Sequence, residues 1–248
     1  MEDGISLPDW ASLSELWQTT LGWQPNSQQQ ALFQQLYQEI LLGNRQLNLT
    51  RITTPEDFWE KHLWDSLRGI APYLQSAETR ASLRAIDIGS GAGFPGIPVA
   101  IAQPTWQVTL LDSTRKKVAF LQTLCTHLGL ENAIAIADRA EQLGQHPGHR
   151  EAYDLALVRA VGAASICAEY ALPFLKVGGL AILYRGQQET DRPALQAAVS
   201  QLGGAVEAVE AFATPLSQAQ RHCLLLRKVT PTDYRYPRSV GIPAQQPL

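Results

Sequence analysis

The stretch "AIDIGSGAGFPGIPVA", residues 85–100, places four glycines and two prolines between two apolar runs. Glycines permit positive φ angles and let a ligand lie against the main chain. Prolines fit there only in the loop or in the first turn of a helix. The stretch therefore predicts a strand, a ligand-binding loop and a helix. Asp87 stands in that strand, two residues before the first glycine, Gly89.

Short β-type runs alternate with helical patterns after residue 83, which predicts right-handed βαβ crossovers and a mostly parallel sheet. No helical pattern separates the last two runs, so we expect them to form an antiparallel hairpin. The fold class is therefore α/β with a seven-stranded sheet. The seven runs are 84–88, 107–111, 133–137, 153–158, 180–184, 205–212 and 222–229.

Residues before the first run read as helices, because their apolar residues recur at helical spacing. The sequence divides accordingly into an N-terminal helical extension (1–82), a core (83–230) and a proline-rich basic tail (231–248), which we expect to be an extended surface segment. The predicted helices are 9–21, 27–42, one that opens at Thr54-Pro55, 114–128, and 191–202 with Asp191 as its N-cap.

Composition limits the classes of function. The chain of 248 residues has a net charge of −3 and so lacks the strong basic excess typical of many nucleic-acid-binding proteins. Residues 221–248 nevertheless hold five basic residues against one acidic residue, which fits an anionic partner or a solvated surface. The three cysteines are widely spaced and predict neither a disulfide framework nor a zinc site. We see no signal peptide and no run long enough to span a membrane, so we expect a cytoplasmic protein.

The glycine loop fits two cofactors. Gly91 to Gly96 matches the G-x-G-x-x-G pattern for a dinucleotide, whereas Asp87-Ile-Gly89-Ser-Gly91-Ala-Gly93 matches the acid-x-G-x-G-x-G pattern of Rossmann-like S-adenosylmethionine-dependent methyltransferases. Asp112 ends the second run and has the right type and place to accept hydrogen bonds from a ribose. The acid at Asp87, the terminal hairpin and the helical extension favour methyl transfer. A nicotinamide-dependent oxidoreductase remains an alternative.

Several blocks of sequence are spread over roughly residues 30–245. They are "NLTRI" (48–52), "HLWDSL" (62–67), "IDIGSGAGFPGIPVAI" (86–101), "LLDSTRKKVAFL" (110–121), "DRAEQL" (138–143), "YDLALVRAV" (153–161), "GG" (178–179) and "YPRSVGIP" (236–243). In this order the blocks resemble the RsmG family, also called glucose-inhibited division protein B. This resemblance implies a class I methyltransferase that modifies N7 of one guanosine, at position 527 in the 530 loop of 16S ribosomal RNA.

The same resemblance implies where S-adenosyl-L-methionine binds. It places Phe94 over the cofactor, Ala140 and Glu141 beside the adenine, and Arg159 next to the reactive centre. After the fifth run the family usually has Lys-Gly, whereas this chain has Arg185-Gly186. The implied cofactor-binding residues are Gly89, Gly91, Phe94, Asp112, Ser113, Thr114, Ala140, Glu141 and Arg159.

The residues themselves suit methylation of guanine N7. The chain has no D-P-P-Y-like turn after the fourth run and no cysteine in the setting of a nucleophile. N7 needs neither, because its lone pair already points outward. We therefore assign no general base. His62 and Asp65 lie at i, i+3 and could face the pocket, although such a pair is more often structural. As RNA-binding candidates we take Lys117, Arg139, Arg185 and Arg221.

The expected partner is 16S ribosomal RNA or the 30S subunit, and we expect a monomer without metal or membrane contact. A non-catalytic ribosome-assembly factor, using the same pocket to sense cofactor, is the alternative from another functional class.

Overall fold

The structure, a computed structural model, describes residue 7 and residues 10–75, 82–186 and 192–248. The strands are β1 (Arg84–Ile88), β2 (Gln107–Asp112), β3 (Ala133–Ala137), β4 (Tyr153–Arg159), β5 (Leu175–Arg185), β6 (Gly204–Ala213) and β7 (Gln220–Lys228). The helices before β1 are α1 (Trp10–Leu21), α2 (Ser27–Leu47), α3 (Pro55–Phe58), the π-helix η1 (Trp59–Trp64), α4 (Asp65–Arg68) and α5 (Ala71–Gln75). The later ones are α6 (Gly96–Ala102), α7 (Arg115–His127), α8 (Ala140–Leu143), α9 (Ala164–Ala171), the 3₁₀ turn η3 (Leu172–Phe174), α10 (Arg192–Gln201) and α11 (Ile242–Gln245).

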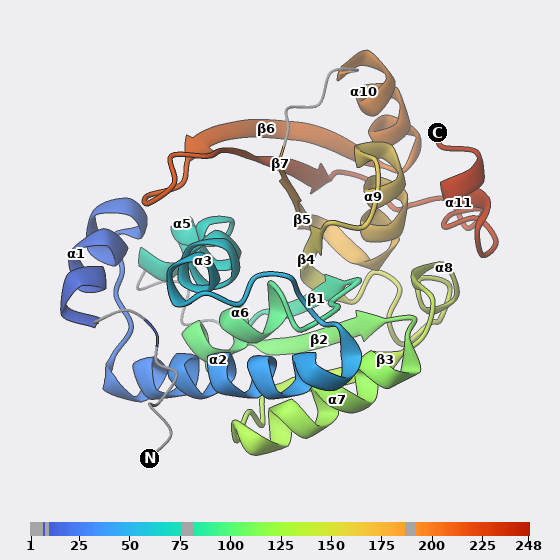
Figure 1. The fold of residues 1–248 in the computed structure, drawn as a ribbon. Coiled ribbons are helices and arrows are strands. Elements are labelled where there is room, and N and C mark those ends of the chain that lie inside the picture. The colour runs from blue at the N-terminus through green and yellow to red at the C-terminus, as the bar shows by residue number, and fades with distance from the viewer. Residues whose placement is uncertain (1–6, 8–9, 76–81, 187–191) are drawn as a thin grey trace.

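The sheet has seven strands in the order β3-β2-β1-β4-β5-β7-β6 (Figure 1). Strands β1 to β5 pair in parallel, and β7 runs antiparallel to both β5 and β6. The predicted parallel sheet and its terminal hairpin are therefore confirmed. Strands β2 and β3 are added on one side of β1, and β4 is added on the other side. The carboxyl ends of the strands at this switch in strand order form the crevice where such sheets bind ligands.

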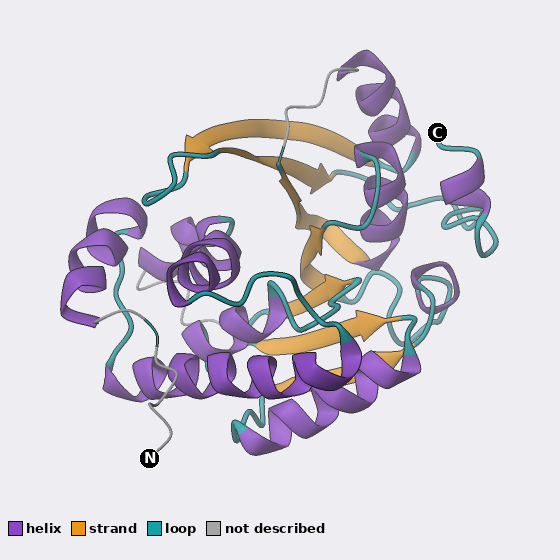
Figure 2. Cartoon of the chain, in the orientation of Figure 1, coloured by secondary structure: helices purple, strands orange, loops and turns teal. Residues whose placement is uncertain are grey.

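Helices cover both faces of the sheet (Figure 2). Ala85 and Val108 point into one core, which includes residues of α2, α6 and α7, whereas Ile86 and Val158 point into a second core with residues of α9 and α10. Burial of both faces explains why the middle strands are almost continuously apolar. The predicted helix starting at Asp191 is α10, and its N-cap lies outside the described residues.

The helical extension packs on the first of these faces. Trp17 of α1 is fully buried. Its ring is stacked on Phe33 of α2 and contacts Trp59 edge-on, with the centroids of Trp17 and Trp59 5.2 Å apart. The third helix starts after Thr54 with proline in its first turn, as predicted, but no side-chain hydrogen bond caps it. It then passes through the π-helix η1. Such wide turns are frequently found at functional sites.

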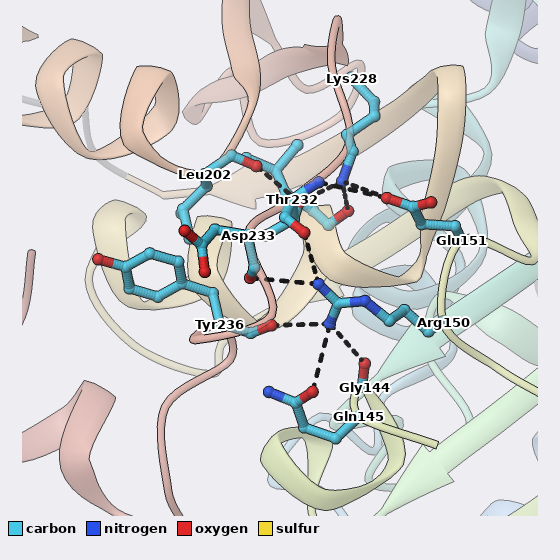
Figure 3. Close-up of polar contacts among 10 residues, drawn as sticks. Gly144, Gln145, Arg150, Glu151, Leu202, Lys228, Thr232, Asp233 and Tyr236 are labelled. Atoms are coloured by element: carbon cyan, nitrogen blue, oxygen red, sulfur yellow. Dashed lines mark hydrogen bonds and ion pairs between the residues drawn. The ribbon is translucent and has the colours of Figure 1, made fainter. Parts of the chain in front are cut away.

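The tail differs from the expected extended surface segment. Tyr236 and Pro243 are buried, and the tail ends in the short helix α11. Arg150 explains the docking, because its guanidinium donates hydrogen bonds to the carbonyl oxygens of Thr232 (2.6 Å) and Tyr236 (2.7 Å), as Figure 3 shows. The periodicity of the tail could not reveal these contacts, because its partners lie more than 80 residues away.

A buried lysine anchors the start of the tail. The Nζ atom of Lys228 donates to the carbonyl of Leu172 (2.8 Å) and to the hydroxyl of Thr232, and it lies 3.7 Å from a carboxylate oxygen of Glu151 (Figure 3). Burial lowers the pKa of Lys228 to about 8, although the negative charge of Glu151 raises it in part. The ammonium group is thus enclosed but has hydrogen-bond acceptors, as a buried charge requires.

Candidate active site

Asp87 fixes the glycine loop between β1 and α6. One oxygen of its fully buried carboxylate, Oδ2, accepts hydrogen bonds from the hydroxyl of Ser90 (2.6 Å) and the backbone N–H of Gly96 (2.8 Å). Burial raises the pKa of Asp87 to about 6, although both hydrogen bonds and the charge of Arg159 oppose this rise. The acid within the strand therefore holds the two ends of the loop together.

The loop leaves bare main chain at the end of β1. Gly89 has φ +74°, and a Cβ atom there would lie 2.6 Å from a methyl group of Val161. A larger side chain at this residue would thus both strain the backbone and fill the space beside it. Gly89 is exposed, so the main chain at this point is open to a ligand.

Asp112 holds the loop from the neighbouring strand. Its Oδ2 accepts the N–H of Gly91 (2.9 Å), and its Oδ1 accepts the N–H of Thr114 (2.7 Å). Each carboxylate oxygen can accept a further hydrogen bond. Asp112 lines a cavity, so it retains acceptor capacity toward a hydroxyl-bearing ligand.

That cavity, here called the glycine-loop cavity, has a volume of about 250 Å³ and lies at the ends of β1, β2 and β4. It brings together several of the residues implied for the cofactor, namely Gly89, Asp112, Ser113, Ala140 and Glu141. Gly91, Phe94, Thr114 and Arg159 are not among its lining residues. Two further wall residues, Tyr170 and Ala244 of the tail, had no sequence pattern that marked them.

Glu141 connects this cavity to the tail. Its buried carboxylate accepts hydrogen bonds from Arg139 (2.8 Å) and from the backbone N–H of Gly241 (3.0 Å). Burial raises the pKa of Glu141, but these hydrogen bonds outweigh burial and hold the pKa below its ordinary value. Arg139, predicted to contact RNA, lies on the wall of the glycine-loop cavity and forms an ion pair there.

Arg159, at the end of β4, is held by the helical extension. Its Nη1 donates to the carbonyl of Lys61 (2.7 Å) and to Oδ2 of Asp65 (3.1 Å), and its Nη2 donates to Nδ1 of His62 (3.1 Å). An acceptor nitrogen must be unprotonated. Burial, Arg159 and Lys61 all lower the pKa of His62 well below its ordinary value, which agrees with a neutral ring.

A second cavity, here called the arginine cavity, opens beside this cluster with a volume of about 570 Å³. Three arginines line it together: Arg159, expected next to the reactive centre, and the RNA-binding candidates Arg185 and Arg221. His62 and Asp65 line it as well, together with Lys61, which no sequence pattern had singled out. Lys117 lies instead on the first turn of α7, outside both cavities.

Phe94 belongs to the wall behind the arginine cluster. Its buried ring stacks on His62, with centroids 4.1 Å apart and planes 6° apart, and Arg159 lies 5.6 Å from the ring centroid. This side chain therefore orients His62 in the present structure. Closure of Phe94 over a cofactor remains a prediction.

Consecutive residues after β4 line the two cavities. Ala160 lines the arginine cavity and its neighbour Val161 lines the glycine-loop cavity. Ala160 has φ +57°, a left-handed conformation that is uncommon for residues other than glycine. Backbone of this kind clusters at functional sites.

Other kinds of site find little support. Within the described ranges, no group of three or more His, Cys, Asp or Glu residues could hold a metal ion, and the three cysteines are buried thiols. No helix in the described part of the chain is long and apolar enough to cross a membrane.

A Rossmann-like sheet with a terminal antiparallel hairpin, a glycine loop at the end of β1 and acids at β1 and β2 define the class of S-adenosylmethionine-dependent methyltransferases. Solved structures agree with the fold at low identity. MtNAS in complex with MTA and tNA aligns with a TM-score of 0.54 and 13% identity over 89% of this chain and 76% of that chain. The putative transferase PH0793 from Pyrococcus horikoshii aligns with a TM-score of 0.51 and 16% identity over 66% of this chain and 63% of that chain.

The family is shown by sequence comparison. A family model described as GidB, rRNA small subunit methyltransferase G, matches residues 29–224. Ribosomal RNA small subunit methyltransferase G of Nostoc punctiforme is 60% identical over 95% of this chain and 97% of its own length. The protein of the same name from Synechococcus sp. (strain JA-2-3B'a(2-13)) is 56% identical over 97% of this chain and 94% of its own length. The chain belongs to this family of methyltransferases, and the oxidoreductase alternative is wrong.

Proposed function

We propose that this enzyme transfers the methyl group of S-adenosylmethionine to N7 of one guanosine, position 527 in the 530 loop of 16S ribosomal RNA. The observation that carries the proposal is that the neighbouring residues Ala160 and Val161 line the two cavities, one each. One cavity offers bare backbone and an acid for a nucleoside cofactor. The other offers clustered arginines for an RNA strand.

In this proposal the cofactor lies in the glycine-loop cavity. Asp112 accepts hydrogen bonds from the ribose, and the main chain at Gly89 lies against the donor. The cofactor supplies an electrophilic methyl group on a sulfonium. The S–C bond breaks as the N7–C bond forms, the sulfur keeps the bonding pair, and the positive charge passes to the base. Gly91, Phe94, Ser113, Thr114, Ala140 and Glu141 complete the proposed site.

The arginine cavity then receives the target nucleotide. Arg185 and Arg221 contact phosphates or the base, with Lys117 and Arg139 as outer RNA contacts. Arg159 is fixed by three acceptors of the helical extension and so shapes the cavity next to the reacting atoms. No proton must leave N7 before attack, so positioning can supply most of the rate enhancement, up to about 7–11 kcal/mol in favourable cases.

We also propose that the protein works as a monomer in the cytoplasm, on the 30S subunit or on its RNA. Light scattering of the purified protein tests the oligomeric state.

The decisive experiment is a single-turnover assay with labelled cofactor and 30S subunits, followed by mass spectrometry of the RNA. We expect one 7-methylguanosine in the 530 loop. Label on another nucleotide or another atom would overturn the proposed target. The absence of label from RNA would favour the non-catalytic assembly factor.

A further inference from the structure

The arginine cavity is basic, yet it contains a carboxylate. Asp65 is the acidic residue among its described lining residues, where it stands with Lys61, Arg185 and Arg221. Only 9% of Asp65 is exposed. Asp65 is already paired with Arg159 there, and a carboxylate repels RNA phosphates, so any contact it makes with RNA must be with a hydrogen-bond donor.

The carboxylate of Asp65 keeps acceptor capacity. Within the described part of the chain, its hydrogen bond is the one that Oδ2 accepts from Nη1 of Arg159. Two carboxylate oxygens can accept about four hydrogen bonds. Asp65 therefore retains capacity for N–H donors that enter the cavity.

Guanine presents the donors that such a group would accept. Its N1–H and its exocyclic 2-amino group donate side by side on the Watson–Crick edge, whereas adenine, cytosine and uracil do not place two donors next to each other there. Unpaired RNA bases are commonly read on this edge. N7 lies on the opposite side of the purine, so a guanine held through N1 and N2 leaves N7 free to face the donor.

Charge development adds a second reason. The base becomes positively charged as methyl transfer proceeds, and its N1–H becomes a stronger donor. A carboxylate at N1 therefore stabilises the transition state more than it stabilises the neutral base. Its position is held by Arg159, which in turn is held by His62 and the carbonyl of Lys61.

We propose that Asp65 accepts hydrogen bonds from N1–H and the 2-amino group of the target guanine, and so selects guanine in the arginine cavity. This proposal rests on the proposed methylation of guanine N7. Asp65 is then a catalytic residue that touches the substrate, and Arg159 and His62 are positioning residues.

The test uses 30S subunits reconstituted with 16S RNA that carries either guanosine or inosine at the target position. Inosine keeps N7, O6 and N1–H but lacks the 2-amino group. We expect the wild-type enzyme to methylate guanosine at least about tenfold faster than inosine, since a site built around a hydrogen bond rejects the analogue that lacks it. We expect Asp65→Ala, which removes both acceptor oxygens, to slow guanosine methylation about 100-fold and to bring the ratio of the two rates near one.

Lys61→Gln is the matched control, because Lys61 lines the same cavity but bears a positive charge. It should lower both rates by the same factor and leave the ratio unchanged. Calorimetry with S-adenosylhomocysteine shows whether each variant is folded.

The proposal is overturned if the wild type treats inosine and guanosine alike, a result that needs no variant. It is also overturned if folded Asp65→Ala keeps the wild-type ratio, which would leave Asp65 with a merely structural role toward Arg159. If the wild type transfers no methyl to N7 of guanosine, the proposed function fails and this inference fails with it.

Discussion

The glycine-loop cavity and the arginine cavity lie at the same edge of one sheet, yet they are built differently. The first is made of main chain at the ends of β1 and β2 and of acids, and its acids Asp112 and Asp138 are already hydrogen-bonded to backbone N–H groups. The second is made of long basic side chains from β4, β5 and β7 together with the helical extension. The difference indicates a site for a small molecule beside a surface for a polyanion, and single substitutions should affect one without the other.

The largest expected effect is that of Gly89→Val in the glycine-loop cavity. A branched side chain at φ +74°, with its Cβ 2.6 Å from Val161, fills the space against which the cofactor lies. We expect the dissociation constant for S-adenosylhomocysteine, measured by calorimetry, to rise at least about 100-fold, while affinity for RNA is retained.

Gly129→Val controls for backbone strain alone, because Gly129 has φ +62° with no atom within 4 Å of its Cβ position. Wild-type cofactor affinity in Gly89→Val, or an equal loss in Gly129→Val, would contradict the assignment.

Arg221→Ala should act on the arginine cavity alone. Removing one phosphate contact should weaken RNA binding about tenfold at low salt and reduce the slope of log K against log salt by about one. Filter binding over a salt series measures both quantities, and S-adenosylhomocysteine affinity should not change. Arg235→Ala is the matched control, because the Arg235 side chain is 76% exposed and lies outside both cavities. An unchanged salt slope in Arg221→Ala would show that Arg221 does not neutralise a phosphate.

Glu169→Gln should have a smaller effect, confined to ligand binding in the glycine-loop cavity. The buried carboxylate of Glu169 pairs with Arg238 at 2.6 Å and so holds the tail, whose Ala244 lines the glycine-loop cavity. A loosened tail should weaken binding of S-adenosylhomocysteine about fivefold in calorimetry, because the competent form is less populated. Asp233→Asn, which alters an exposed ion pair of the same tail, should leave the affinity unchanged. A loss of RNA affinity in Glu169→Gln would show that the two cavities are not independent.

The smallest effect concerns the anchor of the tail at Lys228. Burial holds its pKa at about 8 in the folded protein, below the ordinary 10.5. Between these pH values the unfolded chain binds more protons, so the free energy of unfolding should rise with pH. The wild type should gain on the order of 2 kcal/mol relative to Lys228→Met over this range. Denaturant unfolding of both proteins at pH 7.5 and 10 measures the gain. An equal change in the free energy of unfolding of wild type and Lys228→Met would contradict the prediction.

The fold was largely predictable because local patterns carry it. Short β-type runs, most of them separated by helical patterns, located all seven strands, and β3 has the predicted bounds. β5 begins at Leu175 rather than at the predicted residue 180, because its backbone already pairs with β4 there. The prediction missed this start because Gly178 and Gly179 interrupt the apolar pattern. The antiparallel hairpin followed from the absence of a helix between its strands.

The site was predictable only where strand ends place it. Arg159 and Arg185 end neighbouring parallel strands, so their meeting in one cavity follows from topology. The contact of Gly241 with Glu141 joins segments 100 residues apart in sequence. The ion pair of Arg139 with Glu141 is local, but no periodic pattern in the sequence marks it. The hydrogen bonds of Arg159 to the π-helix likewise required three-dimensional packing.

The attachment of Arg159 to η1 and Asp65 has a practical consequence for engineering. A shortened enzyme that starts at β1 would keep the whole sheet and the glycine loop. It would nevertheless lose the carbonyl of Lys61, the ring of His62 and the carboxylate of Asp65, all three acceptors of this guanidinium. The freed arginine would swing into the space meant for substrate, so the smallest working enzyme must include the helices from α3 onward.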